Sequence, residues 1–365
     1  QGVASGFEAN WIPIGTYKDF DARYYFQGTF DGGGRTITGM MISSTSEYSV
    51  GLFGYLYEAT VQNLTMAKSN NINLTTTSKD DIYIGSIAGQ MAKGKIINCH
   101  NQCQLKCSDK KVGIGGIVGA TSNNSVLSAC SNSGAVTIEK GHGHGGGIVA
   151  YNNSSTIVSC FNTGEIKVNA SDGAAYAGGI VGYSMGSNSI SHCYSTGDII
   201  AKSPRTAYSG GIAGATGSTI GSCFATGTVS AESTDYNLAA AGGIMGFSNS
   251  NGNIQINNCL ALTTGGVKAS GSTSDNQQTG RIIGYDKNNG VTLSNNYAST
   301  NIKLTIGTTE TAPTDNIGGD KANGANTYLD DVADYVAAWT GPEDTKAFTA
   351  IGIDANGLLP QLKAI

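Results

Sequence analysis

The feature that most constrains this chain is a short glycine-rich segment that recurs at a nearly fixed distance. Gly178-Gly179-Ile180-Val181-Gly182 is its clearest copy, and seven related segments begin near residues 51, 85, 115, 146, 210, 242 and 280. The first large apolar residue of each copy follows that of the previous copy after 30 to 38 residues, and five of the seven steps lie between 30 and 32. Such a period predicts a solenoid or a linear array, in which each unit contacts its neighbours, instead of a globular domain with one core.

Each unit carries three apolar segments, which predict three short strands. In one unit these are residues 178–182, 189–194 and 198–201, and the polar residues 202–209 that follow are expected to form a loop to the next unit. With 53 glycines and only 5 prolines, the composition favours short strands and tight turns over long helices. Three strands and three corners per unit predict an all-β fold, a parallel β-helix (β-solenoid) of about eight coils.

The two ends of the chain depart from this pattern. Residues 1–45 are expected to form an N-terminal β cap, residues 46–305 the solenoid, and residues 306–365 a C-terminal cap, because the terminal coils of a solenoid need cover for their open edges. Leu329, Val332, Val336 and Trp339 have helical spacing, which predicts one short helix near residues 328–339.

The repeated glycines are interpreted as structural. A glycine pair allows either a bend with positive φ or a close approach to the neighbouring coil that a Cβ would prevent. The residues predicted to act in this way are Gly115, Gly116, Gly178, Gly179, Gly210, Gly211, Gly242 and Gly243.

Six of the eight cysteines stand at one repeat position, three residues after an apolar anchor. Stacked coils place equivalent Cα atoms about 4.8 Å apart, but parallel Cβ directions hold the Cβ atoms farther apart than a disulfide requires. We therefore expect a ladder of buried free thiols that act as small apolar side chains. Its members are Cys99, Cys130, Cys160, Cys193, Cys223 and Cys259.

Charge and hydropathy bear on several classes of partner. Charged residues make up 13% of the chain and the net charge is -5, which argues against nucleic-acid binding. No run of eighteen apolar residues occurs, so no membrane span is expected within this chain. The neutral, Ser/Thr/Asn-rich composition is typical of an exported protein, and we expect an extracellular or outer-membrane surface location, with any export signal removed or never present.

The repeats resemble the GLUG motif through their Gly-Gly-Ile-Val-Gly segments, each followed by Ile-x-x-Cys-Tyr/Phe-x-Thr-Gly. Phe26-Gln27-Gly28-Thr29-Phe30-Asp31-Gly32 is similar to the leading segment of such arrays, and Leu359-Pro360-Gln361-Leu362 to their ending. That family includes surface proteins of gut Bacteroidetes and the non-catalytic repeats of IgA-specific metallopeptidases. The resemblance implies a repeat scaffold and leaves the activity open.

Motifs for metal chemistry are weak. The metallopeptidases of that family would carry His-Glu-x-x-His, and none of the four histidines here is followed by Glu. His142 and His144 are weak candidates for a metal site, because such sites need three or four ligands and none is nearby in sequence. We expect no cofactor and, within this chain, no peptidase activity.

Candidate binding residues come from two repeat positions. Glu165 and Asp198 occupy the same place in adjacent coils, where two carboxylates could form a glycosidase pair or a calcium site. Phe161, Tyr194 and Phe224 follow the cysteines and could belong to a binding face, although core packing is favoured. The preferred hypothesis is a non-enzymatic, adhesin-like binding or spacer module for a host protein or glycan. The alternatives are an accessory region of an IgA-protease-like peptidase and a carbohydrate-active β-helix enzyme.

Overall fold

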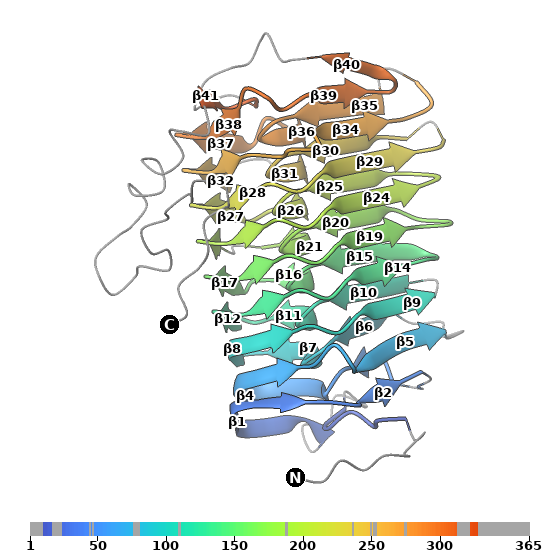
Figure 1. Cartoon of the computed structure of the whole chain (residues 1–365), viewed down its shortest axis with the longest axis vertical. Helices are drawn as coiled ribbons and strands as arrows, with labels where there is room; N and C mark the ends of the chain where they lie inside the picture. Colours follow the sequence, from blue (N-terminus) through green and yellow to red (C-terminus); the bar gives the residue numbers. More distant parts are fainter. Residues whose placement is uncertain are drawn as a thin grey trace.

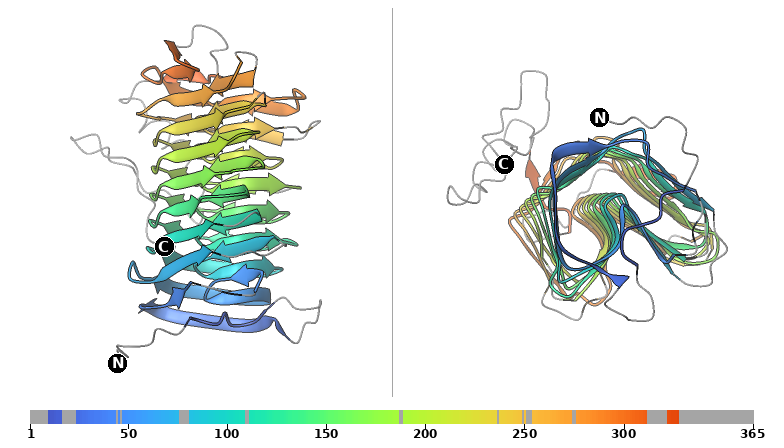
Figure 2. Two further views of the ribbon diagram at one scale, coloured as in Figure 1. Left: turned by 90° about the vertical axis from the view of Figure 1, so that its right-hand side faces the viewer. Right: turned by 90° about the horizontal axis from the view of Figure 1, so that it is seen from below.

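The chain winds into a rod of stacked coils, as the computed structural model shows in Figures 1 and 2. The structure describes residues 10–16, 24–43, 45, 47–75, 81–108, 111–186, 189–235, 237–248, 250, 254–273, 276–311 and 322–327. Successive coils pair through three parallel sheets, here named A, B and C, which run the length of the rod. The predicted all-β parallel solenoid of about eight coils is confirmed, and the described residues contain no helix. The helix expected near residues 328–339 lies outside the described residues.

Sheets B and C each receive one strand per coil. Sheet C contains β3 (Ser49–Val50), β6 (Ile82–Gly85), β10 (Lys111–Gly115), β15 (His142–Gly146), β20 (Ala175–Gly178), β25 (Ala207–Gly210), β30 (Ala239–Gly242) and β35 (Gln277–Gly280). Sheet B contains β2 (Met41–Ile42), β5 (Asn71–Thr75), β9 (Leu105–Ser108), β14 (Val136–Ile138), β19 (Ile166–Asn169), β24 (Ile199–Ser203), β29 (Val229–Ser233), β34 (Val267–Ser270), β39 (Leu304–Ile306) and β40 (Thr309–Thr311).

Sheet A follows sheet C in each coil and is divided into three strips. It starts with the long strands β1 (Phe26–Ile37) and β4 (Phe53–Met66). The first strip contains β7 (Ala88–Ala92), β11 (Val118–Ser122), β16 (Val149–Asn153), β21 (Val181–Met185), β26 (Ala213–Thr216), β31 (Met245–Ser248) and β36 (Ile283–Asp286). The second contains β8 (Lys95–Asn101), β12 (Val126–Ser128), β17 (Thr156–Val158), β22 (Ser189–Ser191), β27 (Thr219–Gly221), β32 (Ile254–Asn257) and β37 (Val291–Ser294). The third contains β13 (Ser131–Asn132), β18 (Phe161–Asn162), β23 (Tyr194–Ser195), β28 (Phe224–Ala225), β33 (Leu260–Ala261), β38 (Tyr297–Ser299) and β41 (Ala325–Thr327).

The segment expected to be a loop at residues 202–209 is largely strand. β24 continues to Ser203 and β25 begins at Ala207, so only three residues separate them. Small side chains conceal this strand in the sequence, because Ala207-Tyr208-Ser209-Gly210 has none of the branched aliphatic residues that mark a buried strand. β25 is therefore a full member of sheet C, the sheet that carries the candidate site.

The core consists of ladders of equivalent side chains. Ile157 pairs with Ile190 in the next coil, and Ile190 pairs with Ile220. All three are fully buried, as are the cysteines that follow them. Because every coil has nearly the same shape, each buried residue packs on its own counterpart above and below, which explains the regular period of the sequence.

The glycine pair marks the bend between sheets C and A. A Cβ on Gly179 would collide with the carbonyl oxygen of Gly211 in the next coil and with the Ser195 side chain. Neither Gly178 nor Gly179 has a positive φ. Of the two reasons expected for these glycines, close approach between coils is therefore the one that applies here.

A ladder of asparagines closes the turn between sheets A and B. The Asn132 side-chain amide donates to the Gly134 carbonyl oxygen at 2.8 Å and to Asn162 Oδ1 of the next coil at 2.8 Å. Asn101 donates in the same way to Asn132 Oδ1 at 2.7 Å. Since all three are buried, these bonds satisfy polar groups that would otherwise be costly inside the rod.

The two ends of the rod differ from its middle. At the N-terminal end β1 pairs with β4, and the Phe26 and Phe53 rings pack 4.8 Å apart. At the C-terminal end sheet B finishes with the antiparallel pair β39–β40. Buried Arg281 takes the place of the second glycine of the bend and donates to the Ser299 carbonyl oxygen at 3.1 Å and to Asn326 Oδ1 at 2.9 Å.

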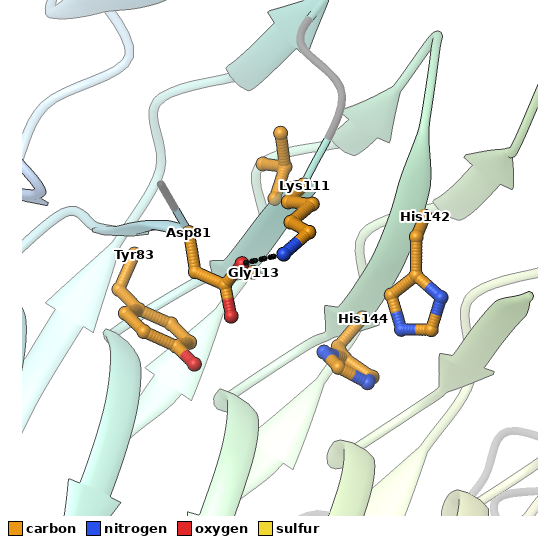
Figure 3. Close-up of a pocket in the computed structure, with 7 residues that line it drawn as sticks. Asp81, Tyr83, Lys111, Gly113, His142 and His144 are labelled. Atoms are coloured by element: carbon orange, nitrogen blue, oxygen red, sulfur yellow. Dashed lines mark ion pairs between the residues drawn. The ribbon is translucent and has the colours of Figure 1, made fainter. Parts of the chain in front are cut away.

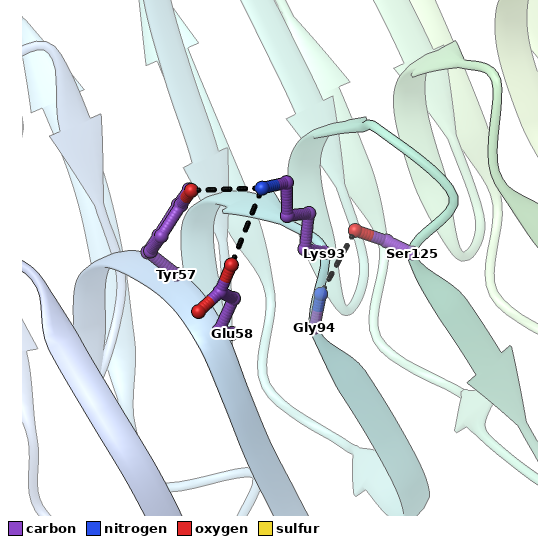
Figure 4. Close-up of polar contacts among 5 residues, drawn as sticks. All are labelled: Tyr57, Glu58, Lys93, Gly94 and Ser125. Atoms are coloured by element: carbon purple, nitrogen blue, oxygen red, sulfur yellow. Dashed lines mark hydrogen bonds and ion pairs between the residues drawn. The ribbon is translucent and has the colours of Figure 1, made fainter.

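Polar contacts also join successive coils, both at the surface and beneath it (Figure 4). Lys93 Nζ lies 3.0 Å from the Tyr57 hydroxyl and 3.2 Å from Glu58 Oε1 of the preceding coil. These hydrogen bonds, the Tyr57 bond first, raise the pKa of the exposed Lys93 ammonium. The Gly94 amide donates to Ser125 Oγ of the following coil at 3.3 Å.

In the part of the chain that the structure describes, no helix is long and apolar enough to cross a membrane.

Candidate functional site

Two rows of side chains face each other across the outer corner between sheet C and the first strip of sheet A. We call this the aromatic corner. The sheet C row lies two residues before the first glycine of each bend and consists of Ser49, Tyr83, Gly113, His144, Tyr176, Tyr208, Ala240 and Gln278. The sheet A row consists of Tyr55, Gln90, Ala120, Tyr151, Tyr183, Ala215, Phe247 and Tyr285.

Rings from the two rows contact each other, which shows that the corner is concave on its outer side. Tyr176 and Tyr183 belong to one coil, and their ring centroids are 5.1 Å apart. Tyr208 and Phe247 stack across the corner at 4.2 Å with an interplanar angle of 4°. These rings form an apolar cluster separate from the core, so the wall of the coil has apolar side chains on both faces here.

One coil contributes no ring to the aromatic corner. Its two positions are Gly113 and Ala120, whereas every other coil provides at least one aromatic or imidazole ring. A cavity of about 330 Å³ lies over Gly113. It is lined by Asp81, Tyr83, Lys111, Val112, Gly113, His142 and His144 (Figure 3).

Tyr83 leans over the glycine that creates this cavity. A Cβ added to Gly113 would lie 2.8 Å from Tyr83 Cδ1. The Tyr83 ring also reaches toward Tyr151, two coils away, with a centroid distance of 6.3 Å. The absence of a side chain at Gly113 therefore sets both the position of the Tyr83 ring and the open space beside it.

The polar groups of the cavity lie around its ring-lined floor. Lys111 Nζ and Asp81 Oδ1 form an ion pair at 3.4 Å, and both side chains are more than half exposed. His142 Nδ1 accepts a hydrogen bond from the Ala174 amide at 3.2 Å, so the neutral ring carries its proton on Nε2. The ring nitrogens of His144 have no hydrogen-bond partner among the described residues.

Burial keeps the rings of the cavity neutral at physiological pH. It lowers the pKa of His142, and it lowers that of His144 to about 3, with a smaller contribution from the neighbouring His142 charge. Burial, followed by the charge of Asp81, raises the pKa of Tyr83 to about 12. The cavity thus combines neutral ring faces with one internally compensated pair of charges.

The two histidines considered as weak metal candidates, His142 and His144, both line this cavity. The His142 and His144 rings meet edge to face at 5.1 Å, and His144 packs on Tyr176 at 5.0 Å. Across the described ranges, no group of three or more His, Cys, Asp or Glu side chains could hold a metal ion.

The six aligned cysteines are all buried and free. Leu64 and Asn296 occupy the same position in the outer coils, since Leu64 pairs with Cys99 and Asn296 Oδ1 accepts from the Cys259 amide at 3.0 Å. Burial raises the pKa of Cys99 and of Cys130, which keeps these thiols protonated. They act in the core and face no cavity described here.

The carboxylates and aromatics predicted from the sequence lie at a different corner. Glu165 and Asp198 occupy equivalent exposed positions before β19 and β24, and Asp198 Oδ1 accepts from the Thr228 amide at 2.8 Å. Phe161, Tyr194 and Phe224 stack in a ladder with centroid distances of 4.9 Å. Tyr194 and Phe224 are buried, and Phe161 is half-buried.

The sequence reasoning missed the aromatic corner, although a signal for it exists. Tyr83, His144, Tyr176 and Tyr208 stand at the same distance before their glycine pairs. Aligning the units on those glycines would have shown a column of rings interrupted at Gly113. The polar character assigned to this segment concealed the column.

The comparison with protein-family models agrees with the repeat assignment. Residues 173–200 match the GLUG motif, a stretch that runs from just before β20 into β24 and so covers most of one coil. The protein is therefore a parallel β-solenoid that carries the GLUG motif. Among solved structures, it is similar to a putative immunoglobulin A1 protease from Bacteroides ovatus, with 21% identity over 97% of this chain and 81% of that chain and a TM-score of 0.49. A search of curated proteins finds no match.

Proposed function

We propose that this protein is a non-enzymatic, adhesin-like binding module of an exported or surface-associated protein, and that it binds its partner through the aromatic corner. The observation that carries the proposal is the cavity over Gly113, which combines a ring-lined floor with a small number of polar groups. Concave, mostly apolar sites with a few placed polar groups are typical of ligand binding. The regular coils on either side hold these residues on strands, which keeps the site rigid.

The positions of the carboxylates favour binding over catalysis. A carbohydrate-active enzyme needs converging acids at its site. Glu165 and Asp198, the pair considered for that role, are exposed turn residues between sheets A and B, whereas the cavity is lined by residues on or directly before the sheet C strands β6, β10 and β15. Asp81, the one carboxylate that lines the cavity, is paired with Lys111.

The test is a binding screen of the purified chain against arrays of host-surface proteins and glycans. We expect at least one specific ligand whose binding is weakened by Tyr83→Ala. The screen would contradict the proposal if no ligand bound, or if every ligand bound equally well to the Tyr83→Ala variant.

The resemblance of the repeats to IgA-peptidase accessory regions supplies the second candidate. Incubation of IgA with the chain alone tests the feature that both candidates share, which is the lack of a catalytic site in this chain. We expect intact IgA chains by gel electrophoresis, and cleavage products would overturn the non-enzymatic assignment.

A further inference from the structure

We propose that the cavity over Gly113 binds one ring of a neutral carbohydrate chain, held between Tyr83 and His144, with the rest of the chain extending along the aromatic corner. This inference rests on the proposed binding function and names the chemical class of the ligand. Three features of the corner support it: the ring faces in the cavity, the polar groups on its rim, and the lack of a positively charged groove or a free strand edge at β10.

The floor of the cavity suits the apolar face of a sugar ring. Tyr83 lies on one side of Gly113 and His144 on the other, in the coils before and after it (Figure 3). Tyr83 leans over Gly113, and the space of about 330 Å³ beside its ring is where one sugar ring would lie. A pyranose presents C–H bonds on its faces, and these pack well against aromatic faces. Because His144 stays uncharged, its ring offers such a face at physiological pH.

The rim suits hydroxyl groups. A sugar hydroxyl both donates and accepts hydrogen bonds. Asp81 supplies acceptors, Lys111 supplies donors, and His142 presents an Nε2–H, all around the same cavity. The two charges compensate each other, so a neutral ligand can bind without burying an unpaired charge.

Other polymers fit this corner less well. An extended peptide binds best by adding a strand to a free sheet edge, but β10 lies between β6 and β15, so its backbone is already paired on both sides. Single-stranded nucleic acid also stacks on aromatic rings, yet it needs a positively charged groove. The rim here carries one Lys balanced by one Asp, and the chain has a net charge of -5.

The size of the cavity favours a single ring of a longer chain. About 330 Å³ is near the lower end of ligand pockets. A free monosaccharide would gain little there, whereas an oligosaccharide can make further contacts with the rings of neighbouring coils. Affinity is therefore expected to rise with chain length.

The experiment begins with an array of neutral hexose and N-acetylhexosamine oligosaccharides, followed by calorimetric titration of the best-binding oligosaccharide. Tyr83→Ala removes one ring face, and we expect a Kd about tenfold higher. Gly113→Tyr inserts the ring that Tyr176 and Tyr208 provide in other coils. The Tyr83 ring must turn aside, because its Cδ1 would lie 2.8 Å from the new Cβ, and with the cavity filled binding should be lost. Ser230→Tyr is the control, because it adds the same ring at a partly exposed position of sheet B, outside the aromatic corner, and should leave Kd unchanged.

The outcomes separate the two proposals. If no neutral oligosaccharide binds but a host protein does, and Tyr83→Ala weakens that binding, the carbohydrate inference fails while the binding function stands. If oligosaccharides bind equally to wild type, Tyr83→Ala and Gly113→Tyr, the site assignment fails. If neither glycans nor proteins bind, both proposals fail. Thermal unfolding of each variant shows whether a loss of binding reflects a loss of folding.

Discussion

At the scale of single residues, the least expected feature is a left-handed residue before each cysteine. In each of the eight coils, the residue directly before the cysteine position has a positive φ of 51° to 56°. Leu64 and Asn296 take the place of the cysteine in the outer coils. These residues are Asn63, Asn98, Ala129, Ser159, His192, Ser222, Asn258 and Asn295. Asn tolerates this conformation better than most L-residues, and half of the positions have it. The others hold the bend because the packed coils on both sides impose it.

This strain predicts that the solenoid can be stabilised. Replacing Ala129, Ser159 and Ser222 together with Asn should raise the free energy of unfolding by up to about 1 kcal/mol per site, because Asn reduces the cost of the left-handed conformation. All three side chains are only partly buried, which leaves room for the amide. Denaturant titration measures the effect.

The control replaces Ala129 with a residue that disfavours positive φ. Ala129→Val adds a β-branched side chain, which is poorly compatible with positive φ, and should destabilise the protein. Equal stability of the Asn triple variant and Ala129→Val would contradict this account of the bend.

At the scale of elements, the last coil is held by a residue that breaks the repeat. Arg281 stands where the preceding coil has Gly243, and its guanidinium donates to the Ser299 carbonyl oxygen and to Asn326 Oδ1. Its main-chain amide donates to Asn323 Oδ1 at 3.0 Å. The buried side chain thereby connects β36, β38 and the segment that contains β41.

We predict that Arg281→Gly, which restores the repeat sequence, destabilises the C-terminal end of the rod. The cost should be about 1 to 3 kcal/mol, since buried acceptors lose their donors. Limited proteolysis should show earlier cleavage near residues 322–327, and thermal unfolding should begin at a lower temperature.

Arg281→Lys provides the comparison. Lys keeps the charge but cannot reproduce the fork of donors that reaches two elements at once, so it should also be destabilising. A glycine variant as stable as the wild type would show that the guanidinium does not anchor this end.

At the scale of the whole molecule, the rod consists of nearly equivalent coils stacked on one another. Gly178 pairs with Gly210 in the next coil, and Gly210 pairs with Gly242. Each of these glycines is followed by the same bend, so one coil can be exchanged for its neighbour at these points. Stability of such arrays depends on contacts between adjacent units.

Deleting residues 179–210 should therefore give a folded protein with one coil fewer. The deletion joins Gly178 to Gly211 and leaves every residue that lines the Gly113 cavity in place. Small-angle scattering should show a rod shorter by about 4.8 Å, with a β-sheet circular dichroism spectrum like that of the parent protein.

Deletion of half a coil, residues 179–194, tests whether register matters. It would place sheet C strands against sheet A strands, so the buried and exposed residues would no longer match. We expect aggregation or loss of the β-sheet spectrum. A well-folded half-coil variant would contradict the claim that the rod can be shortened only by whole coils.

The fold class, the period and the aliphatic and cysteine ladders of the core were predictable from the sequence. Glycine pairs, cysteines and aliphatic anchors recur because identical coils must stack, and that requirement is visible in one dimension. The bend at Gly179 was predictable for the same reason, although only the structure separated close approach from positive φ as its cause.

The position of the proposed ligand site could not be predicted in this way. Glu165 and Asp198, or Phe161 and Tyr194, looked suitable because they share a repeat position, yet the first pair lies in exposed turns and the second in a ladder of packed rings, and none of them lines the Gly113 cavity. Tyr83, Lys111 and His144 lie on the neighbouring sheet C strands β6, β10 and β15, and the stacking of these strands brings them together around Gly113. A period along the chain reveals which residues are equivalent, but whether a side chain leans over its neighbour and leaves a hollow depends on packing in three dimensions.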